Sequence, residues 1–505
     1  MHGSVGHLIW SVCYLVVLFG LSLYGLHRYV IVYLFLKNRN KVPSPLGTFK
    51  ELPQVTVQLP IFNEYYVVER LLESVSKLDY PKELLQIQLL DDSTDDTAEL
   101  SVRKTAELQA AGFDIELIQR KDRTGFKAGA LEEGMKNCKG EFILILDADF
   151  VPAPDLLLKT IHYFTDPKVG MIQSRWGHIN RTYSILTRVQ AMFLDGHLIL
   201  EQTARSRSGR FFNFNGTGGL WRKSCIEVAG GWQHDTLTED LDLSYRAQML
   251  GWKFIFLKDL ITPAELPVEM NGFKSQQHRW TKGSIQTCKK VLPQIWKCNL
   301  PFYVKLEATI HLTSNFTYLL LACLCVLIYP GNGLGGGFWR AVLVDVPIFM
   351  AASLSAGIFY ICAQRELHPK TWYKEILFLP VLLALGIGLA LNNARAVLEA
   401  VFNHETAFMR TPKYGIEKKT QSWKSAKYTS IKTLLPILEL LFAGYFGFVL
   451  AKTALLGQFF SVPFMMMFFG GFAWVALSSI SQSLPKFSGS SRDEDDDLEK
   501  SAEAV

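Results

Sequence analysis

Long stretches without charge constrain this chain most, because they fit a lipid bilayer better than water. Residues 8–26 carry no charged side chain, and these nineteen residues are enough to cross the hydrocarbon core of a membrane. Further apolar segments lie near 308–329, 342–363, 375–393, 431–451 and 458–480. Residues 42–303, in contrast, carry frequent charges and no long apolar run. The pattern predicts a multi-pass membrane protein with one large water-exposed unit inserted between membrane helices.

The overall composition agrees with a mixture of two environments. A charged fraction of 20% is too high for an all-membrane chain of 505 residues, and a hydrophobic fraction of 49% is too high for a wholly soluble one. The balance of 52 Lys and Arg against 47 Asp and Glu is +5, which does not indicate a nucleic-acid partner. The eight cysteines form no CxxC pair, so neither a zinc site nor a disulfide framework is indicated.

The first apolar segment reads as an uncleaved anchor over residues 1–41, because no basic n-region or cleavage site is evident. Lys37, Arg39 and Lys41 follow it, and no Lys or Arg precedes it. The positive-inside rule then places the N-terminus outside and the unit at 42–303 in the cytosol. We expect an integral protein of a plasma, inner or Golgi membrane.

The C-terminal membrane region, 304–484, presents a parity problem. If 375–393 crossed fully after two earlier crossings, the basic stretch 410–427 would lie outside, against the positive-inside rule. We therefore expect 375–401 to be embedded or interfacial without a full crossing. Residues 485–505 form an acidic tail that we expect to be disordered.

Within the soluble unit, short β-rich runs alternate with segments of helical spacing. The expected strands are 55–60, 84–92, 114–120 and 141–150, and the expected helices include 67–78 and 97–112. This alternation predicts an α/β fold with a mostly parallel, doubly wound sheet. Such sheets bind ligands at the carboxyl ends of their strands.

Acidic residues follow two of these strands. Asp91 and Asp92 end one run, and Asp147 and Asp149 come at the end of another. A single Asp after a strand is most often a turn or a helix cap, and we assign Asp95 and its neighbour Asp96 that role. Two such groups at strand ends of one sheet converge on one crevice. On an extended chain Asp147 and Asp149 share a side, which favours a divalent cation bound together with substrate phosphates.

Three more motifs carry polar or aromatic groups. Lys127 offers a charge for a diphosphate, although alone it could be a surface lysine. On a helix, Gln276, Arg279 and Trp280 share a face suited to a sugar ring and phosphates, or to a membrane-interface belt. The glycine-rich run after Phe214 is either a loop with exposed amides or a plain flexible loop.

Together these motifs resemble the processive family 2 glycosyltransferases of the cellulose synthase superfamily, most closely the cellulose synthase-like A and C group. The resemblance rests on the order Asp-Asp-Ser, Asp-x-Asp, Thr-Glu-Asp and Gln-x-x-Arg-Trp, and on stretches such as 58–64, 125–135, 173–180 and 214–222. It covers roughly residues 50–300. It implies a GT-A-type nucleotide-sugar-binding domain, Mg²⁺ or Mn²⁺ as cofactor, and a lipid bilayer, a nucleotide-sugar donor and a polysaccharide or lipid acceptor as partners.

The resemblance also implies roles for individual residues. Asp240 would be the general base, and Glu239 is grouped with it as catalytic. The donor would be held by Asp91, Asp92, Asp147, Lys127 and Glu64, with Asp149 as the metal ligand. The acceptor and diphosphate would be held by Gln276, Arg279, Trp280, Asn215 and Gly216. Residues 409–413 look like the gating-loop motif of cellulose synthase but depart from its usual form, and 375–428 would be an interfacial and gating segment.

The expected reaction is direct displacement at the anomeric carbon, with one base taking the acceptor proton and with inversion from an α-linked donor to a β-linked product. A helix N-terminus near Asp240 should keep that base ionised. UDP-glucose and GDP-mannose both remain possible donors for a β-linked polymer, expected to be β-1,4-linked. The alternatives are a lipid glycosyltransferase that adds one or a few sugars, and a transporter or receptor with a non-catalytic domain.

Overall fold

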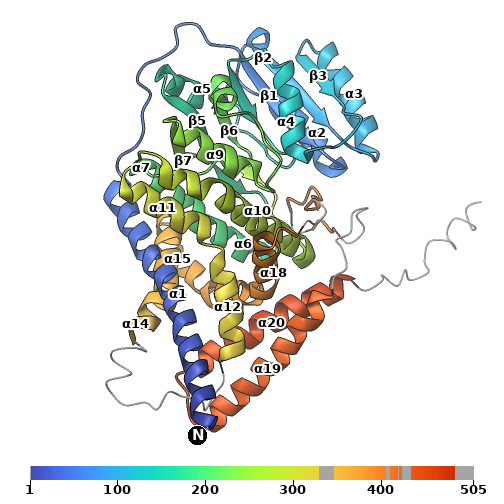
Figure 1. Ribbon diagram of the computed structural model, residues 1–505. Coiled ribbons are helices and arrows are strands. Elements are labelled where there is room, and N and C mark those ends of the chain that lie inside the picture. The colour runs from blue at the N-terminus through green and yellow to red at the C-terminus, as the bar shows by residue number, and fades with distance from the viewer. Residues whose placement is uncertain (1, 329–345, 405–409, 419, 424–433, 484–505) are drawn as a thin grey trace, which may run out of the picture.

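The computed structural model describes residues 2–328, 346–404, 410–418, 420–423 and 434–483 (Figure 1). A sheet with its covering helices forms one end of the molecule, and a bundle of apolar helices forms the other. The predicted tail, 485–505, and Met409 of the predicted gating motif lie outside the described residues.

The sheet is mixed and has seven strands in the order β3-β2-β1-β4-β6-β5-β7. The strands are β1 (Val55–Ile61), β2 (Leu85–Asp91), β3 (Asp114–Ile118), β4 (Phe142–Ile145), β5 (Val169–His178), β6 (Gly219–Arg222) and β7 (Lys253–Ala264). The first four are mutually parallel, as predicted, and β7 is parallel to β5. The short strand β6 runs antiparallel between β4 and β5, so the sheet is less uniformly parallel than its first half indicates.

Both faces of the sheet are covered, which explains the continuous apolar runs in its central strands. Alternate side chains of β4 enter two separate hydrophobic cores: Phe142 and Leu144 enter one, and Ile143 and Ile145 enter the other. The covering helices on the sheet side of the molecule are α2 (Tyr65–Ser76), α3 (Thr97–Ala110), α4 (Phe126–Lys136), α5 (Leu156–Ile161), α8 (Lys223–Val228) and α9 (Glu239–Met249).

The strand predicted over 141–150 is the clearest local correction. β4 ends at Ile145, and Ala148 and Asp149 lie in a turn. The apolar run continues beyond the strand because Leu146, Ala148 and Phe150 are buried in the core, although only Leu146 still donates a backbone hydrogen bond to β1, at 3.2 Å from the carbonyl of Gln58. The apolar pattern over 141–150 indicates which residues are buried. It does not indicate where β4 ends, which depends on backbone hydrogen bonds to the neighbouring strands.

The chain between β5 and β6 leaves the sheet and joins it to the membrane helices. It forms α6 (Ile185–Asp195), the π-helical turn η3 (Gly196–Glu201) and α7 (Gln202–Arg207). After β7, the long helix α10 (Met270–Lys297) runs toward the apolar bundle. The remaining helices are α11 (Phe302–Thr313), α12 (Phe316–Leu327), α14 (Val346–Phe349), η5 (Met350–Leu354), α15 (Ser355–Leu367), α16 (Trp372–Ile376), α17 (Leu379–Gly388), α18 (Ala390–Val401), α19 (Leu435–Leu455) and α20 (Val462–Ser483).

Three described helices are long and apolar enough to cross a membrane, namely Leu8–Asn38, Leu435–Leu455 and Val462–Ser483. The first lies in α1 (His2–Asn38), one helix that extends beyond the uncharged segment 8–26 and lies within the predicted anchor 1–41. The pair α11 and α12, bent by 53°, would be a fourth span if it is counted as one. The predicted segment 342–363 yields no such helix among the residues that the structure describes, although its first residues lie outside them.

The ambiguous segment 375–401 is a bent pair. Trp372–Gly388 and Ala390–Val401 meet at 41°, which is the shape of a broken span or a re-entrant loop. The polar residues of α18 face protein, since Asn392 donates to the backbone of Lys274 and Glu399 lies 3.3 Å from the ammonium of Lys282, both on α10. The polarity of α18 therefore reflects packing against α10, and the expectation that 375–401 does not cross fully stays a prediction.

Candidate active site

A pocket lies between the carboxyl ends of the strands, the start of α9 and one face of α10. Twelve of the thirteen residues expected to form the site line it: Glu64, Asp92, Lys127, Asp147, Asp149, Asn215, Gly216, Glu239, Asp240, Gln276, Arg279 and Trp280. Residues more than 200 positions apart in the sequence thus meet in one cavity. Asp91 is the expected residue that does not belong to this lining.

The two acidic residues at the end of β2 have different surroundings. Asp92 accepts hydrogen bonds from the guanidinium of Arg120, at 3.0 Å from Nε and 2.5 Å from Nη2. Asp91 is 1% exposed, and its Oδ1 accepts a hydrogen bond from the backbone N–H of Ser93 at 2.9 Å. Asp91 therefore shapes the turn, and Asp92 is the carboxylate that lies at the pocket. Asp95 holds the start of α3 by accepting from Thr97 N at 3.0 Å.

Asp149 lies in the turn after β4, Asp147 immediately precedes that turn, and the two are paired with different lysines. Asp147 forms a short ion pair with Lys127. The Oδ2 atom of Asp149 lies 2.6 Å from Nζ of Lys413 and accepts from the backbone N–H of Glu265 at 3.1 Å. The extended geometry expected for these two carboxylates is corrected, although both still line the pocket.

Lys127 connects the Asp147 turn to the glycine-rich loop. Its ammonium donates to the carbonyl of Gly216 at 2.9 Å. Burial lowers the pKa of Lys127, but the carboxylates around it, Asp147 first, outweigh this effect and leave the pKa raised. Gly216 has φ +83°, and a Cβ there would lie 3.0 Å from Oδ2 of Asp240, so glycine suits this turn on both counts.

Asp240 lies in the first turn of α9, as expected, and its Oδ1 accepts from the N–H of Leu241 at 2.8 Å. Burial, together with the neighbouring charge of Glu239, raises the pKa of Asp240 to about 7. The expectation that the helix N-terminus keeps this carboxylate ionised is not met, because burial and the charge of Glu239 outweigh the hydrogen bond from the N–H of Leu241. A carboxyl group with a pKa near neutrality is well matched to general-base catalysis.

The helix α10 presents Gln276, Arg279 and Trp280 to the pocket, as their spacing predicts. The ring of Trp280 lies 6.4 Å, centroid to centroid, from that of Trp176, so two indoles line one wall. Burial lowers the pKa of the Arg279 guanidinium, which faces the carboxylates of the pocket.

Another face of α10 fixes the helix in place. Lys274 pairs with the buried Glu439 of α19 at 2.7 Å, and His278 lies 3.1 Å from Glu399 of α18. Gly283, on the same face as Arg279 and Trp280, packs against the loop before α9, since a Cβ there would lie 2.6 Å from the side chain of Thr238. The helix that carries the aromatic wall is thus tied both to the apolar bundle and to the segment that carries Asp240.

The described part of the predicted gating motif covers the acidic side of the pocket. Arg410, Thr411 and Lys413 all belong to the lining, and Arg410 lies 3.1 Å from the carboxylate of Glu64. Burial raises the pKa of Glu64 to about 7, and the charge of Arg410 opposes the rise.

Sequence reasoning missed several pocket residues, among them Trp176 and Glu265. Trp176 lies in the stretch 173–180 that supported the family resemblance, so its aromatic character was an available signal. Glu265 directly follows β7, and its carboxylate accepts from the N–H of Tyr414 at 3.1 Å. No local pattern marks it, because its partners come from another part of the chain.

The carboxylates fit a divalent cation only if substrate phosphates complete its shell. Among the described residues, no group of three or more His, Cys, Asp or Glu has the arrangement of a metal site. The ammonium of Lys413, however, lies 2.6 Å from Asp149, so a positive charge is already accommodated there. One or two carboxylates plus phosphates are the usual ligands of Mg²⁺, and this set can provide the carboxylates.

Comparison with known proteins agrees with this geometry. The family described as "Glycosyltransferase like family 2" matches residues 53–283. Glucomannan 4-beta-mannosyltransferase 7 of Arabidopsis thaliana is 32% identical over 437 residues, which are 83% of this chain and 76% of that protein. Glucomannan 4-beta-mannosyltransferase 2 of the same plant is 40% identical over 280 residues, or 53% of this chain and 52% of that one.

A solved structure supports the fold. The mannosyltransferase PcManGT from Pyrobaculum calidifontis, in complex with GDP-Man and Mn²⁺, aligns with a TM-score of 0.54 and 20% identity. The alignment covers 78% of this chain and all of that one. The likeness confirms the predicted GT-A-like fold.

Proposed function

Because this chain belongs to glycosyltransferase family 2, together with the glucomannan 4-β-mannosyltransferases of the cellulose synthase-like A group, we propose that it extends a β-1,4-linked mannan or glucomannan from GDP-mannose. The observation that carries the proposal is one pocket that joins Asp240, Lys127 and Trp280. These residues are a buried base, a cation for a diphosphate and an aromatic platform for a sugar.

In the proposed reaction, the ionised carboxylate of Asp240 removes a proton from the acceptor hydroxyl as its oxygen attacks the anomeric carbon of the donor. The bond to the nucleoside diphosphate breaks on the opposite face, so the α-linked donor gives a β-linked product. Lys127 and Arg279 lie in the same pocket and stabilise the charge on the departing diphosphate. The indole of Trp280 supports the apolar face of the acceptor sugar.

Asp149, with Asp147, would hold a Mg²⁺ or Mn²⁺ ion once a donor supplies its phosphates. Such an ion, when bound, neutralises charge on the diphosphate. Lys413 would have to leave Asp149 for this to happen, since its ammonium now lies 2.6 Å from that carboxylate. Residues 410–413 would then act as a gate, because the contact between Lys413 and Asp149 would be replaced by a contact between the metal ion and Asp149 when the donor binds.

We also propose that the product leaves through the membrane region. Within the described residues, three helices long and apolar enough to span a membrane, together with two bent helix pairs, support an integral location. Lys37 in the last turn of the first of these helices, with Arg39 and Lys41 after it, favours a catalytic domain in the cytosol. A polymer made there has to cross the bilayer, and the pocket opens beside α10, the helix tied to the bundle.

Purified protein in nanodiscs tests the function. The enzyme is incubated with Mn²⁺, a β-manno-oligosaccharide acceptor and either GDP-mannose or UDP-glucose. We expect elongation with GDP-mannose to products that an endo-β-1,4-mannanase degrades. Products restricted to glucose, or a lipid carrying one or two sugars with no oligosaccharide elongated, would refute the proposal in favour of the alternatives.

A further inference from the structure

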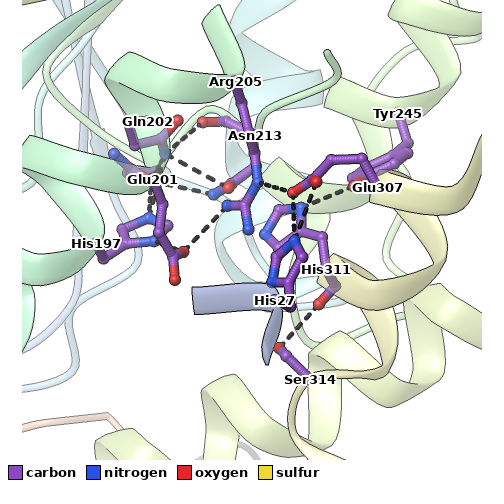
Figure 2. A network of polar contacts seen from close by, with 11 residues as sticks. His27, His197, Glu201, Gln202, Arg205, Asn213, Tyr245, Glu307, His311 and Ser314 are labelled. Atoms are coloured by element: carbon purple, nitrogen blue, oxygen red, sulfur yellow. Dashed lines mark hydrogen bonds and ion pairs between the residues drawn. The ribbon is translucent and has the colours of Figure 1, made fainter. Parts of the chain in front are cut away.

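A continuous polar network runs from His27 in the first membrane helix to His197 and Gln202 (Figure 2). It begins at His27 in α1, whose Nε2 lies 3.0 Å from Glu307 of α11. Glu307 accepts from Nε of Arg205 at 3.0 Å, and Nη1 of Arg205 donates to Glu201 at 3.0 Å. Glu201 in turn lies 2.9 Å from Nδ1 of His197.

The network ends at Asn215, which lines the pocket. Gln202, adjacent to Glu201 in the chain, donates from Nε2 to Oδ1 of Asn215 at 2.8 Å. Nδ2 of Asn213 donates to the same oxygen at 3.0 Å, and Nε2 of His197 lies 3.4 Å from it. The side-chain oxygen of Asn215 thus accepts hydrogen bonds from the amides of Gln202 and Asn213, and we call the contacts from His27 to Asn215 the His27–Asn215 network.

Backbone carbonyls fix the orientation of the amides in this network. Nε2 of Gln202 also donates to the carbonyl of Asn213 at 3.1 Å, and Nδ2 of Asn213 donates to the carbonyl of Phe214 at 3.0 Å. A carbonyl accepts only, so neither amide can be reversed without a clash of two acceptors. The oxygen of Asn215 must therefore face them, and its NH₂ group faces away.

That NH₂ group is an unused donor. Nδ2 of Asn215 is buried and has no hydrogen-bond partner among the described residues. Buried donors are rarely left unpaired, so a ligand oxygen is the natural partner of this one. The next residue, Gly216, lies close to the proposed general base Asp240, since a Cβ on Gly216 would lie 3.0 Å from Oδ2 of Asp240. A sugar whose hydroxyl reaches Asp240 therefore lies against this turn.

The charged part of the network is buried enough to be rigid. The side chains of Arg205 and Glu307 are 2% and 4% exposed. Removing one charge from a buried ion pair leaves the other without compensation, so the arrangement resists change. These ion pairs join α7, η3, α11 and α1, and they lie beside the loop between α7 and β6 that carries Asn215.

We propose that Gln202 and His197 are positioning residues that present Nδ2 of Asn215 to a hydroxyl of the acceptor sugar, and that the ion pairs from Glu201 to His27 tie this geometry to the first membrane helix. The proposal rests on the proposed function for the identity of the acceptor. It gives α1 a part in acceptor binding in addition to its role as an anchor.

The kinetic test separates acceptor from donor. In Gln202→Leu and Glu307→Gln, the Michaelis constant for a β-manno-oligosaccharide should rise about two- to tenfold, the effect of losing or misplacing one hydrogen bond, and that for GDP-mannose should not change. Glu366→Gln is the control, because it removes an ion pair between β7 and α15 that has no contact with Asn215. An equal rise in both constants, or no rise, would overturn the proposal.

A second measurement does not depend on activity. Hydrogen–deuterium exchange of a peptide covering 212–218 should be faster in Gln202→Leu and Glu307→Gln than in the wild type, and unchanged in Glu366→Gln. If the wild type elongates no manno-oligosaccharide, the proposed function fails, and this measurement still decides whether the network holds the loop. Identical exchange in all four proteins would refute it.

Discussion

The pH dependence of the reaction follows from the burial of Asp240. Its pKa is raised to about 7 by desolvation and by the charge of Glu239. A general base acts only when ionised, so activity is present above this pKa and is lost as the pH falls through it. Between pH 8 and pH 6 the ionised fraction falls from about nine-tenths to about one-tenth, so kcat/KM should fall about tenfold.

The assay is release of nucleoside diphosphate measured from pH 5.5 to 9 with the enzyme in nanodiscs. Asp240→Asn should lower kcat by about 10²–10⁴-fold, the usual contribution of a general base, and should leave donor affinity nearly unchanged in a calorimetric titration. Near-normal turnover in Asp240→Asn would refute the assignment.

Glu64 is the necessary control, because burial raises its pKa to about 7 as well. If Asp240 produces the acidic limb of the profile, Glu64→Gln should keep that limb even if its maximal rate is reduced. A flat profile in Glu64→Gln would assign the limb to Glu64, and a flat wild-type profile between pH 6 and 8 would refute the reasoning from burial.

Three further predictions concern the metal, the aromatic wall and the bundle. Asp149→Ala should abolish the Mn²⁺ dependence of donor binding measured by calorimetry, and an unchanged dependence would remove Asp149 from the metal site. Trp280→Ala should lose long products while donor hydrolysis persists, since the donor-binding groups remain; full-length polymer at a normal rate would contradict the stacking role. Gly388→Val should destabilise the bundle by about 1–3 kcal/mol or more, because a Cβ at Gly388 would lie 2.4 Å from the carbonyl of Gly471 on α20. The matched control is Gly386→Val on the same helix, where a Cβ meets nothing within 4 Å, and equal melting temperatures of the two variants would argue against this close packing.

Local sequence patterns were enough to identify the first half of the sheet and twelve residues that line the pocket. The observed ends of β1, β2 and β3 are within two residues of the predicted ends. The agreement is close because short apolar runs between segments of helical spacing indicate which residues are buried. The acidic motifs could be placed at one site because parallel strands present their carboxyl ends at the same edge. The spacing of Gln276, Arg279 and Trp280 likewise specified one helix face.

Other features depend on residues that meet only in the folded chain. The antiparallel strand β6 has no local signature, since pairing direction is decided by the route of the chain between β5 and β6. Asp149 pairs with Lys413, 264 positions away, and no window of sequence contains both. The same holds for the link from His27 to Asn215, which needs three separate segments to pack together.

The pKa of Asp240 shows most clearly what the sequence determines and what depends on the tertiary structure. Its place at the start of a helix was legible in the sequence and favours the ionised form. Its burial follows from packing and, with the charge of the adjacent Glu239, raises the pKa of Asp240 against the opposing charge of Lys127. Residue types and periodicity therefore determined which groups the site contains, whereas the tertiary structure decided their charge states and partners, because solvation and Coulomb energies depend on distances between remote segments.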